Sequence, residues 1–385
     1  MRTPLSTQKA LYLHPLSYIL WIAFFLVMFS THYLEKGSGF SILSLDNIRL
    51  ILYPLLLIGL ITQIILGQKI DKSLFYAFLV IFIFVIIFQV TTSEINFSVL
   101  LRLALFIPLA FVHQLEYRFT VLEKVLLTIS IVLSLIYSYS QGFIGDDNRF
   151  VANSDDPNLS GLTFLLGFYF AARRNYTFFK YCFIILGLLT LSRNFILAIL
   201  LFYAIKYFKE KKVIKLLLSK IPIWLAIFLF NFGLIVIGQI TLFNQSNTFQ
   251  YSTNTSSRVL HWKDTSNKRR IIYNQLALIY IFKDTKSILN GYGEQYTLRK
   301  DIFMPKYVHN TLIDIMMSYG LVITFMIVLL IFLLFQRVVN ISNYEYLYSY
   351  LFFSMFLPGC FSGFVLYAFY AVLCVSPPVK FANND

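Results

Sequence analysis

Apolar runs long enough to cross a lipid bilayer recur from one end of this 385-residue chain to the other. A helix needs about 20 such residues to span the hydrocarbon core. Within a bilayer every backbone polar group needs an internal partner, which leaves helices or closed barrels, and these runs lack the alternation of barrel strands. Only 13% of residues are charged and the mean hydropathy is +0.72, which excludes an ordinary soluble protein. The sequence therefore predicts an all-α, polytopic membrane protein.

The apolar runs predict eleven or twelve spans. The turn at Ser192-Arg193-Asn194 separates two short spans, because one helix of about 33 residues would overshoot the bilayer. The last run contains Pro358-Gly359 and is expected to be one kinked span or two short ones. The chain thus divides into N-terminal helices (1–240), one large polar loop (241–308) and C-terminal helices (309–385). The spans are expected near residues 14–33, 46–66, 73–92, 97–113, 121–141, 158–172, 176–192, 194–208, 219–240, 309–336 and 345–375.

Lysine and arginine concentrate in every second connection, which predicts that the N-terminus and these connections are cytoplasmic. The 241–308 loop then lies on the extracytoplasmic side. It carries ten Lys/Arg and four Asp/Glu. Long loops cross the membrane largely regardless of charge, so its basic character indicates an anionic substrate. The cytoplasmic set is Lys69, Lys72, Arg118, Lys124, Arg173, Arg174, Lys180, Lys206, Lys209, Lys211, Lys212, Lys215 and Lys220.

Four arginines are expected at the outer face. The guanidinium group suits bidentate phosphate contacts, and a charge at membrane depth usually faces a cavity or a partner. The alternatives are ion pairs with nearby carboxylates and one shared anionic ligand; four arginines at one face favour the ligand. The arginines are Arg49, Arg102, Arg149 and Arg193, and the carboxylates are those of Asp46, Glu94, Asp155 and Asp156.

Besides its charge, the large loop contains an apolar segment and a glycine-rich turn. Residues 271–282 are apolar with interleaved tyrosines, which predicts a helix lying on the membrane surface or packed beneath the loop. The Gly291-Tyr292-Gly293 sequence predicts a tight turn. Tyr292, with Tyr296 and Tyr307, either lines an aromatic rim for sugar rings or belongs to a plain turn.

His309 and Asn310 begin a span, so its helix N-terminus is expected at the outer face. The unpaired amides and the positive end of the helix dipole favour a phosphate group there. The same dipole lowers the pKa of His309 and keeps the imidazole neutral, whereas bound pyrophosphate has the opposite effect. Asn310 is an N-cap or a substrate ligand. Asp314, one turn later, orients Asn310 or binds a substrate hydroxyl, since a charge at this depth does not face lipid.

No pattern predicts a metal ion or another cofactor. The five histidines have no ligand spacing, and Cys182, Cys360 and Cys374 lie within apolar runs. The chain has no G-x-x-x-x-G-K-[ST] loop and no nucleotide fingerprint. Neither a metal site nor a nucleic-acid partner is expected.

Five motifs, in order, resemble those of bacterial O-antigen polymerases and O-antigen ligases. The resemblance covers roughly residues 145–335 and includes the large loop before the His-Asn helix. Ile323 departs from the ligases, which carry Gly, Thr or Tyr there. The motifs are R-F-V-A-N-S-D-D-P-N (Arg149 to Asn158), S-R (Ser192, Arg193), R-x-x-x-W (Arg258, Trp262), G-x-G (Gly291, Gly293) and H-N-x9-G (His309, Asn310, Gly320).

The resemblance implies a GT-C-like fold and a metal-independent glycosyltransferase in the bacterial inner membrane, with its site facing the extracytoplasmic side. Its substrates would be undecaprenyl-pyrophosphate-linked oligosaccharides. A polymerase joins two lipid-linked repeats and releases undecaprenyl pyrophosphate. His309 would activate the attacking hydroxyl as a base or, if protonated, hold the pyrophosphate. The leaving pyrophosphate would be stabilised by Arg193 and Arg258, with Arg149 and either Arg102 or Arg49.

The remaining predicted substrate-binding residues are Asn158, Trp262, Tyr292, Asn310 and Asp314. Membrane lipids and a chain-length regulator protein are further expected partners. A ligase, which transfers the glycan to lipid A core, is the first alternative. A transporter of the same lipid-linked sugar is less favoured, because the charges cluster at one surface and the chain shows no internal repeat.

Overall fold

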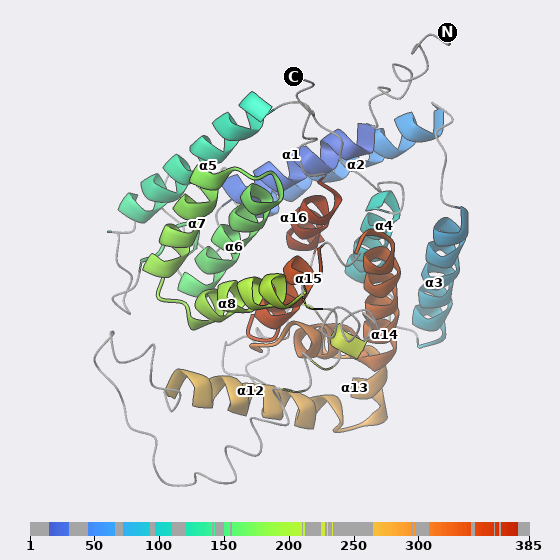
Figure 1. Cartoon of the computed structure of the whole chain (residues 1–385). Helices are drawn as coiled ribbons and strands as arrows, with labels where there is room; N and C mark the ends of the chain where they lie inside the picture. Colours follow the sequence, from blue (N-terminus) through green and yellow to red (C-terminus); the bar gives the residue numbers. More distant parts are fainter. Residues whose placement is uncertain are drawn as a thin grey trace.

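The computed structural model describes residues 15–30, 45–65, 72–92, 97–109, 120–140, 142, 150–154, 156–209, 211, 225–227, 229, 233, 265–293, 296, 308–339, 343–357, 359–361 and 363–375. The elements within these ranges are α-helices, which confirms the predicted all-α class for this part of the chain. Figure 1 shows their arrangement, with α16 and α15 near the centre and α5, α3 and α12 towards the periphery.

The helices precede and follow the polar region in two groups. The first group is α1 (Pro15–Phe29), α2 (Leu45–Ile65), α3 (Lys72–Thr91), α4 (Phe97–Leu109), α5 (Thr120–Ser140), α6 (Pro157–Arg173), α7 (Thr177–Leu189) and α8 (Arg193–Phe208). The second group is α12 (Thr265–Ile281), α13 (Thr285–Asn290), α14 (Thr311–Val338), α15 (Tyr344–Ser354) and α16 (Gly363–Cys374).

Most helices coincide with the predicted apolar runs. The predicted break before α8 is confirmed: Leu191 has a positive φ of 49°, and Ser192 caps α8. The last run is two helices, α15 and α16, with Gly359 at a φ of 78° between them. The predicted span at 219–240 lies almost entirely outside the described residues.

Three described helices, α3, α5 and α14, are long and apolar enough to cross a membrane. In α3 and α5 only 28% of the apolar window is buried, against 61% in α14. The outer helices therefore present broad apolar surfaces, which on a protein in water would cause association, while α14 belongs to the core. These surfaces are compatible with a membrane protein, and the full count of spans stays a prediction.

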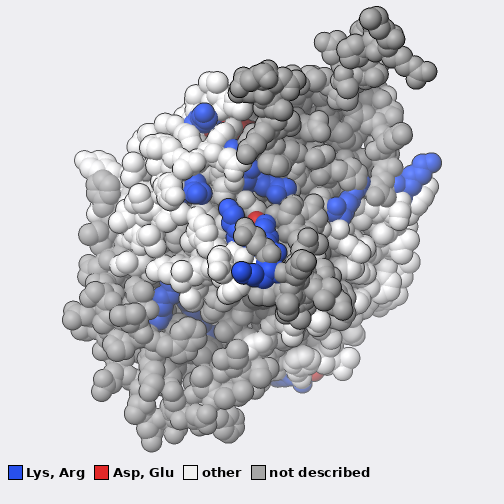
Figure 2. All heavy atoms as spheres, viewed as in Figure 1, with Lys and Arg blue, Asp and Glu red and all other residues white. Residues whose placement is uncertain are grey.

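The helix ends fall into two groups, which we name the His309 end and the Arg173 end. Helices α6, α8 and α14 all begin at the His309 end and finish at the Arg173 end. Helix α15 runs antiparallel to α8, because Ser349 Oγ donates to the Ala198 carbonyl while Lys209 Nζ pairs with Glu345 at 2.6 Å. On the face drawn in Figure 2, Lys and Arg side chains gather near the centre, where Figure 1 draws α15 and α16 in the same view.

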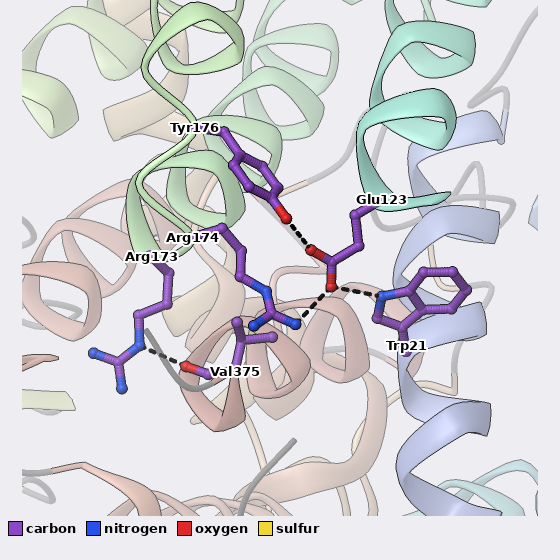
Figure 3. Close-up of polar contacts among 6 residues, drawn as sticks. All are labelled: Trp21, Glu123, Arg173, Arg174, Tyr176 and Val375. Carbon is purple, nitrogen blue, oxygen red and sulfur yellow. Dashed lines mark hydrogen bonds and ion pairs between the residues drawn. The ribbon is translucent and has the colours of Figure 1, made fainter. Parts of the chain in front are cut away.

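A buried carboxylate joins three segments at the Arg173 end. Glu123 of α5 is fully buried and accepts hydrogen bonds from Arg174 Nη2 (2.6 Å), the Tyr176 hydroxyl (2.6 Å) and Trp21 Nε1 (3.3 Å). Figure 3 shows these groups converging on the carboxylate from α1 and from the connection between α6 and α7. Nearby, Arg173 Nε donates to the Val375 carbonyl at 2.8 Å. These contacts tie α1, α5, α6 and the end of α16 together.

Candidate active site

The first turns of α6 and α8 are joined by side-chain hydrogen bonds. Asp156 caps α6, and its Oδ1 accepts from the backbone nitrogen (2.7 Å) and Nδ2 (2.8 Å) of Asn158. The other end of the Asn158 amide, Oδ1, accepts from Ser192 Oγ at 2.9 Å. Ser192 caps α8 and so precedes Arg193, the first residue of that helix. The predicted residues Asn158 and Arg193 are therefore neighbours, 35 positions apart in the chain.

The start of α14 is fixed against the segment that follows α15. Asn310 is the N-cap: its Oδ1 accepts from the backbone nitrogens of Leu312 and Ile313, both at 3.0 Å. Its Nδ2 donates to the Met355 carbonyl at 3.4 Å. Asn310 is fully buried. The capping alternative from the sequence is thus confirmed, and this amide positions the helix start next to His309.

His309 lies between charges from two other elements. The pKa of its imidazole is lowered from 6.5 to about 4, chiefly by burial and then by the positive charge of Arg270 on α12, while Asp156 acts in the opposite direction. These interactions place Asp156, Arg270 and His309 within electrostatic range of one another. At neutral pH the imidazole is therefore neutral and can accept a proton.

Three helix N-termini thus converge at the His309 end, those of α6, α8 and α14. Each carries a partial positive charge at its N-terminus. At α6 the cap already accepts from the first-turn amides, because Asn158 N donates to Asp156 Oδ1 and the next two backbone nitrogens donate to the Asp156 carbonyl. Arg193 is half-buried at the first position of α8. The next side chain, Asn194, is 3% exposed, and its Nδ2 has no hydrogen-bond acceptor among the described residues. Such an arrangement favours an anion that accepts several hydrogen bonds, as a phosphate or diphosphate does.

The G-Y-G turn packs into a break in α14. Gly320 has a φ of 76° and a ψ of 175° inside the helix. A helical carbonyl normally accepts from the residue four positions on, so this break releases the carbonyls before it. The Met317 carbonyl accepts from Tyr292 N (2.7 Å), and the Ser318 carbonyl accepts from Gly293 N (3.0 Å). The turn therefore holds the first half of α14, which follows His309, in place.

Two tyrosine side chains near the turn form hydrogen bonds within the protein. The Tyr292 hydroxyl donates to the Tyr280 carbonyl at 2.9 Å and accepts from Ser287 Oγ at 2.9 Å. Tyr296 is only 1% exposed, which argues against the aromatic-rim alternative for this side chain. Its hydroxyl donates to Asp314 Oδ1 at 2.8 Å and accepts from Val308 N at 3.2 Å. Asp314 is thereby connected to the residue before His309.

Several predicted site residues are not placed. Arg149, Arg258 and Trp262, as well as Tyr307, lie outside the described residues. Arg49 is in α2 and Arg102 in α4, and the side chains of both lie outside the described part. Their predicted contacts with an anionic ligand stay predictions. Of the predicted site residues, the structure places His309, Asn310, Asn158, Arg193, Asp314 and Tyr292.

The sequence interpretation missed Arg270 and Asn194, and it did not place Asp156 beside His309. Arg270 lies 39 positions before His309, too far for any local pattern to connect them. One signal was available: Arg270 lies on the same side of α12 as Ala277 and Ile281, both of which are fully buried. A charge on the buried stripe of a helix needs a partner or a function.

Among the residues that the structure describes, no three His, Cys, Asp or Glu side chains gather as metal ligands would. The expectation of a metal-independent reaction stays a prediction. The chain matches no protein-family model and no curated protein. Its function is therefore argued from the site.

Proposed function

We propose that this protein is a polysaccharide polymerase, of the O-antigen or capsule type, that joins undecaprenyl-pyrophosphate-linked oligosaccharide repeats. One observation carries the proposal: three helix N-termini converge with Arg193, Arg270 and a neutral His309. The helix ends and guanidinium groups favour a diphosphate, and the imidazole supplies a proton acceptor beside it. Binding a diphosphate leaving group and accepting a proton are the two tasks of this glycosyl transfer.

The reaction forms one bond and breaks another. A sugar hydroxyl of one repeat attacks the anomeric carbon of the second, the bond from that carbon to the diphosphate oxygen breaks, and His309 accepts the hydroxyl proton. Undecaprenyl pyrophosphate leaves with the electron pair. Arg193, Arg270 and the amides of α8 stabilise the charge that develops on it. A bound diphosphate raises the proton affinity of His309, which offsets the effects of burial and of Arg270.

The distribution of charge supports an extracytoplasmic site in the bacterial inner membrane. The Arg173 end carries several basic residues, namely Lys206 on the last turn of α8, Lys209 as its C-cap, Arg337 on the last turn of α14, and Arg173 and Arg174. An excess of Lys and Arg is typical of cytoplasmic segments. The His309 end, at the other ends of the same helices, then faces the opposite side.

The direct test incubates the purified chain, in lipid nanodiscs with a chelator, with the lipid-linked repeat alone. The expected result is a ladder of longer lipid-linked glycans. His309→Ala and Arg270→Ala should slow its formation by about 10²–10⁴-fold, the range of a positioned base or charge stabiliser. Lys206→Ala, an exposed cation at the Arg173 end, is the control and should leave the ladder intact. Arg258→Ala, tested in parallel, compares the arginine indicated by the sequence motif with Arg270.

No ladder from competent substrate would refute the polymerase. Addition of lipid A core as acceptor then tests the ligase, which would need the same diphosphate site. Movement of the lipid-linked sugar across a proteoliposome, without new glycosidic bonds, would instead identify a transporter.

A further inference from the structure

Helix α12 has a buried stripe that contains Arg270. Ala277 and Ile281 are fully buried, and Arg270 and Asn274 are half-buried. At 3.6 residues per turn, these four positions lie on one side of the helix. The same side contains the charge that acts on His309, so this face of α12 points to the candidate active site.

The opposite side of α12 is apolar and exposed. Ile279 lies nine residues after Arg270, about two and a half turns, which puts it on the reverse side. It is 65% exposed, and Leu276 beside it is 37% exposed. Ile272, one turn before Leu276, is half-buried, and Phe282, directly after the helix, is 55% exposed. Spacings of three and four residues make these side chains one continuous stripe.

The surroundings of this stripe suit one kind of partner. In Figure 1, α12 runs crosswise to α3 and to the adjoining part of α14, along one edge of the helix bundle. It is too short and polar to be among the helices that could cross a membrane. Exposed Lys283 and Lys286 follow the stripe directly. The intervening carboxylate, Asp284, is occupied as the cap of α13, accepting from Ser287 N at 2.7 Å.

We propose that α12 lies in the plane of the bilayer at the His309 end and inserts its exposed apolar stripe into that leaflet. Ile272, Leu276, Ile279 and Phe282 contact acyl chains, while the ammonium groups of Lys283 and Lys286 contact lipid phosphates. A helix with one apolar side and basic residues beside it binds membranes in this way, with its apolar side about 5–10 Å below the headgroups.

The two faces of α12 give this attachment a consequence for the site. Because one rigid helix contacts lipid on one side and faces His309 on the other, the bilayer surface sets the depth of Arg270. That depth is the level of lipid phosphates, where the diphosphate of a lipid-linked substrate also lies. The attachment itself does not depend on the proposed reaction.

The test measures the depth of α12 with nitroxide labels on the full chain in nanodiscs. Ile279→Cys is labelled in a Cys182→Ser background, in which Cys360 and Cys374 are buried. Ile83→Cys on α3, 46% exposed at wild type, calibrates contact with acyl chains. Lys211→Cys, an exposed site at the Arg173 end, calibrates contact with water. Collisions with oxygen, which partitions into lipid, and with a water-soluble nickel complex are recorded for each label.

The proposal predicts that the label at 279 gains oxygen collisions and loses nickel collisions relative to 211, approaching the values at 83. A label at 279 with the same collision rates as 211 would overturn it. Leu276→Cys provides a second position on the stripe if the first variant does not fold. Addition of anionic lipid to a zwitterionic nanodisc should deepen the label at 279, and Lys283→Gln/Lys286→Gln should abolish that change. An unchanged depth in both nanodiscs would remove the phosphate contact from the proposal.

Discussion

A β-carbon on Gly291 would lie 2.6 Å from the backbone nitrogen of Gly320, so the two glycines meet backbone to backbone. Both have a positive φ, 66° and 76°. The contact brings the turn after α13 into the break of α14, where its amides reach the released carbonyls. The G-x-G and H-N-x9-G motifs are therefore two sides of one contact, which supports the helix that begins beside His309.

Gly320→Ala should detach the turn from α14. The φ and ψ of Gly320 belong to a region that only glycine occupies readily, and an alanine Cβ would lie 2.1 Å from the Leu289 carbonyl oxygen. Strain of about 1–3 kcal/mol is expected from the backbone alone, before the clash is added. Thermal unfolding in one detergent should show a lower Tm, and polymer formation should fall with it.

Gly293→Ala separates the effect of backbone strain from the effect of the steric clash. Gly293 has a φ of 89°, but within the described part of the chain no atom lies within 4 Å of an added Cβ. It should therefore show the conformational cost without the clash and lose less stability than Gly320→Ala. Equal losses would mean that the close approach of the two segments contributes nothing.

The stability of the protein should depend on pH through His309. The pKa of His309 is lowered from 6.5 to about 4, so the unfolded chain takes up this proton first as the pH falls. The contribution to the free energy of unfolding is therefore complete above pH 6.5 and is lost as the pH falls towards 4. His309→Gln should flatten this part of the profile, measured by chemical denaturation at each pH. Identical slopes in both proteins would contradict the buried, neutral imidazole.

A diphosphate at the three helix N-termini should raise the pKa of His309. Linkage then requires that inorganic pyrophosphate binds more tightly as the pH falls and His309 becomes protonated. Calorimetric titrations at several pH values check this. The proton-linked part of the affinity should disappear in His309→Gln, and a pH-independent affinity in the wild type would contradict the contact.

Features set by local rules could be predicted from the sequence. Ser192 before an apolar run and Asn310 before another are N-cap residues, and both cap their helices. Pro358-Gly359 indicated a break that does separate α15 from α16. Each of these depends on a few adjacent residues, and local backbone chemistry decides them.

The relationships that build the site could not be predicted in this way. The proximity of Arg270 to His309 depends on how α12 packs against α14, and the burial of Tyr296 depends on the same packing. The spacing after His309 indicated Gly320, but what requires a glycine there is the turn at Gly293, 27 positions earlier in the chain. Contacts between distant segments follow from the packing of whole helices, which periodicity along one chain does not contain.

Glu123→Gln should destabilise the Arg173 end strongly. The pair of Glu123 and Arg174 is buried, with side chains 0% and 5% exposed. Removal of the carboxylate charge takes away the Glu123 half of a buried ion pair, for which a loss of about 3–5 kcal/mol is typical. The Tm should fall, while polymer formation by the folded fraction should persist, because α6 places about 25 Å between this pair and the His309 end. Glu123→Gln/Arg174→Met, which removes the guanidinium too, should recover part of the lost stability. A double variant less stable than Glu123→Gln would show that the pair's charge balance is unimportant.

Asn194→Leu should separate stability from anion binding. The Asn194 side chain is 3% exposed and its Nδ2 finds no acceptor within the described ranges, a state that typically costs about 1–3 kcal/mol. A leucine of similar size removes this donor, so the Tm of the ligand-free protein should stay constant or rise. If the amide donates to a diphosphate, the same change should weaken inorganic pyrophosphate binding by roughly tenfold, about 1.4 kcal/mol.

Asn343→Leu is the matched control for Asn194→Leu. Asn343 is fully buried as well, but its Nδ2 donates to the Val338 carbonyl at 3.0 Å. Its replacement leaves that carbonyl unsatisfied and should lower the Tm without a specific loss of pyrophosphate affinity. Asn194→Leu and Asn343→Leu should therefore move the two measurements in opposite ways. A drop in Tm for Asn194→Leu with unchanged affinity would assign Asn194 to the support of α8 and leave Arg193, Arg270 and the backbone amides as the anion ligands.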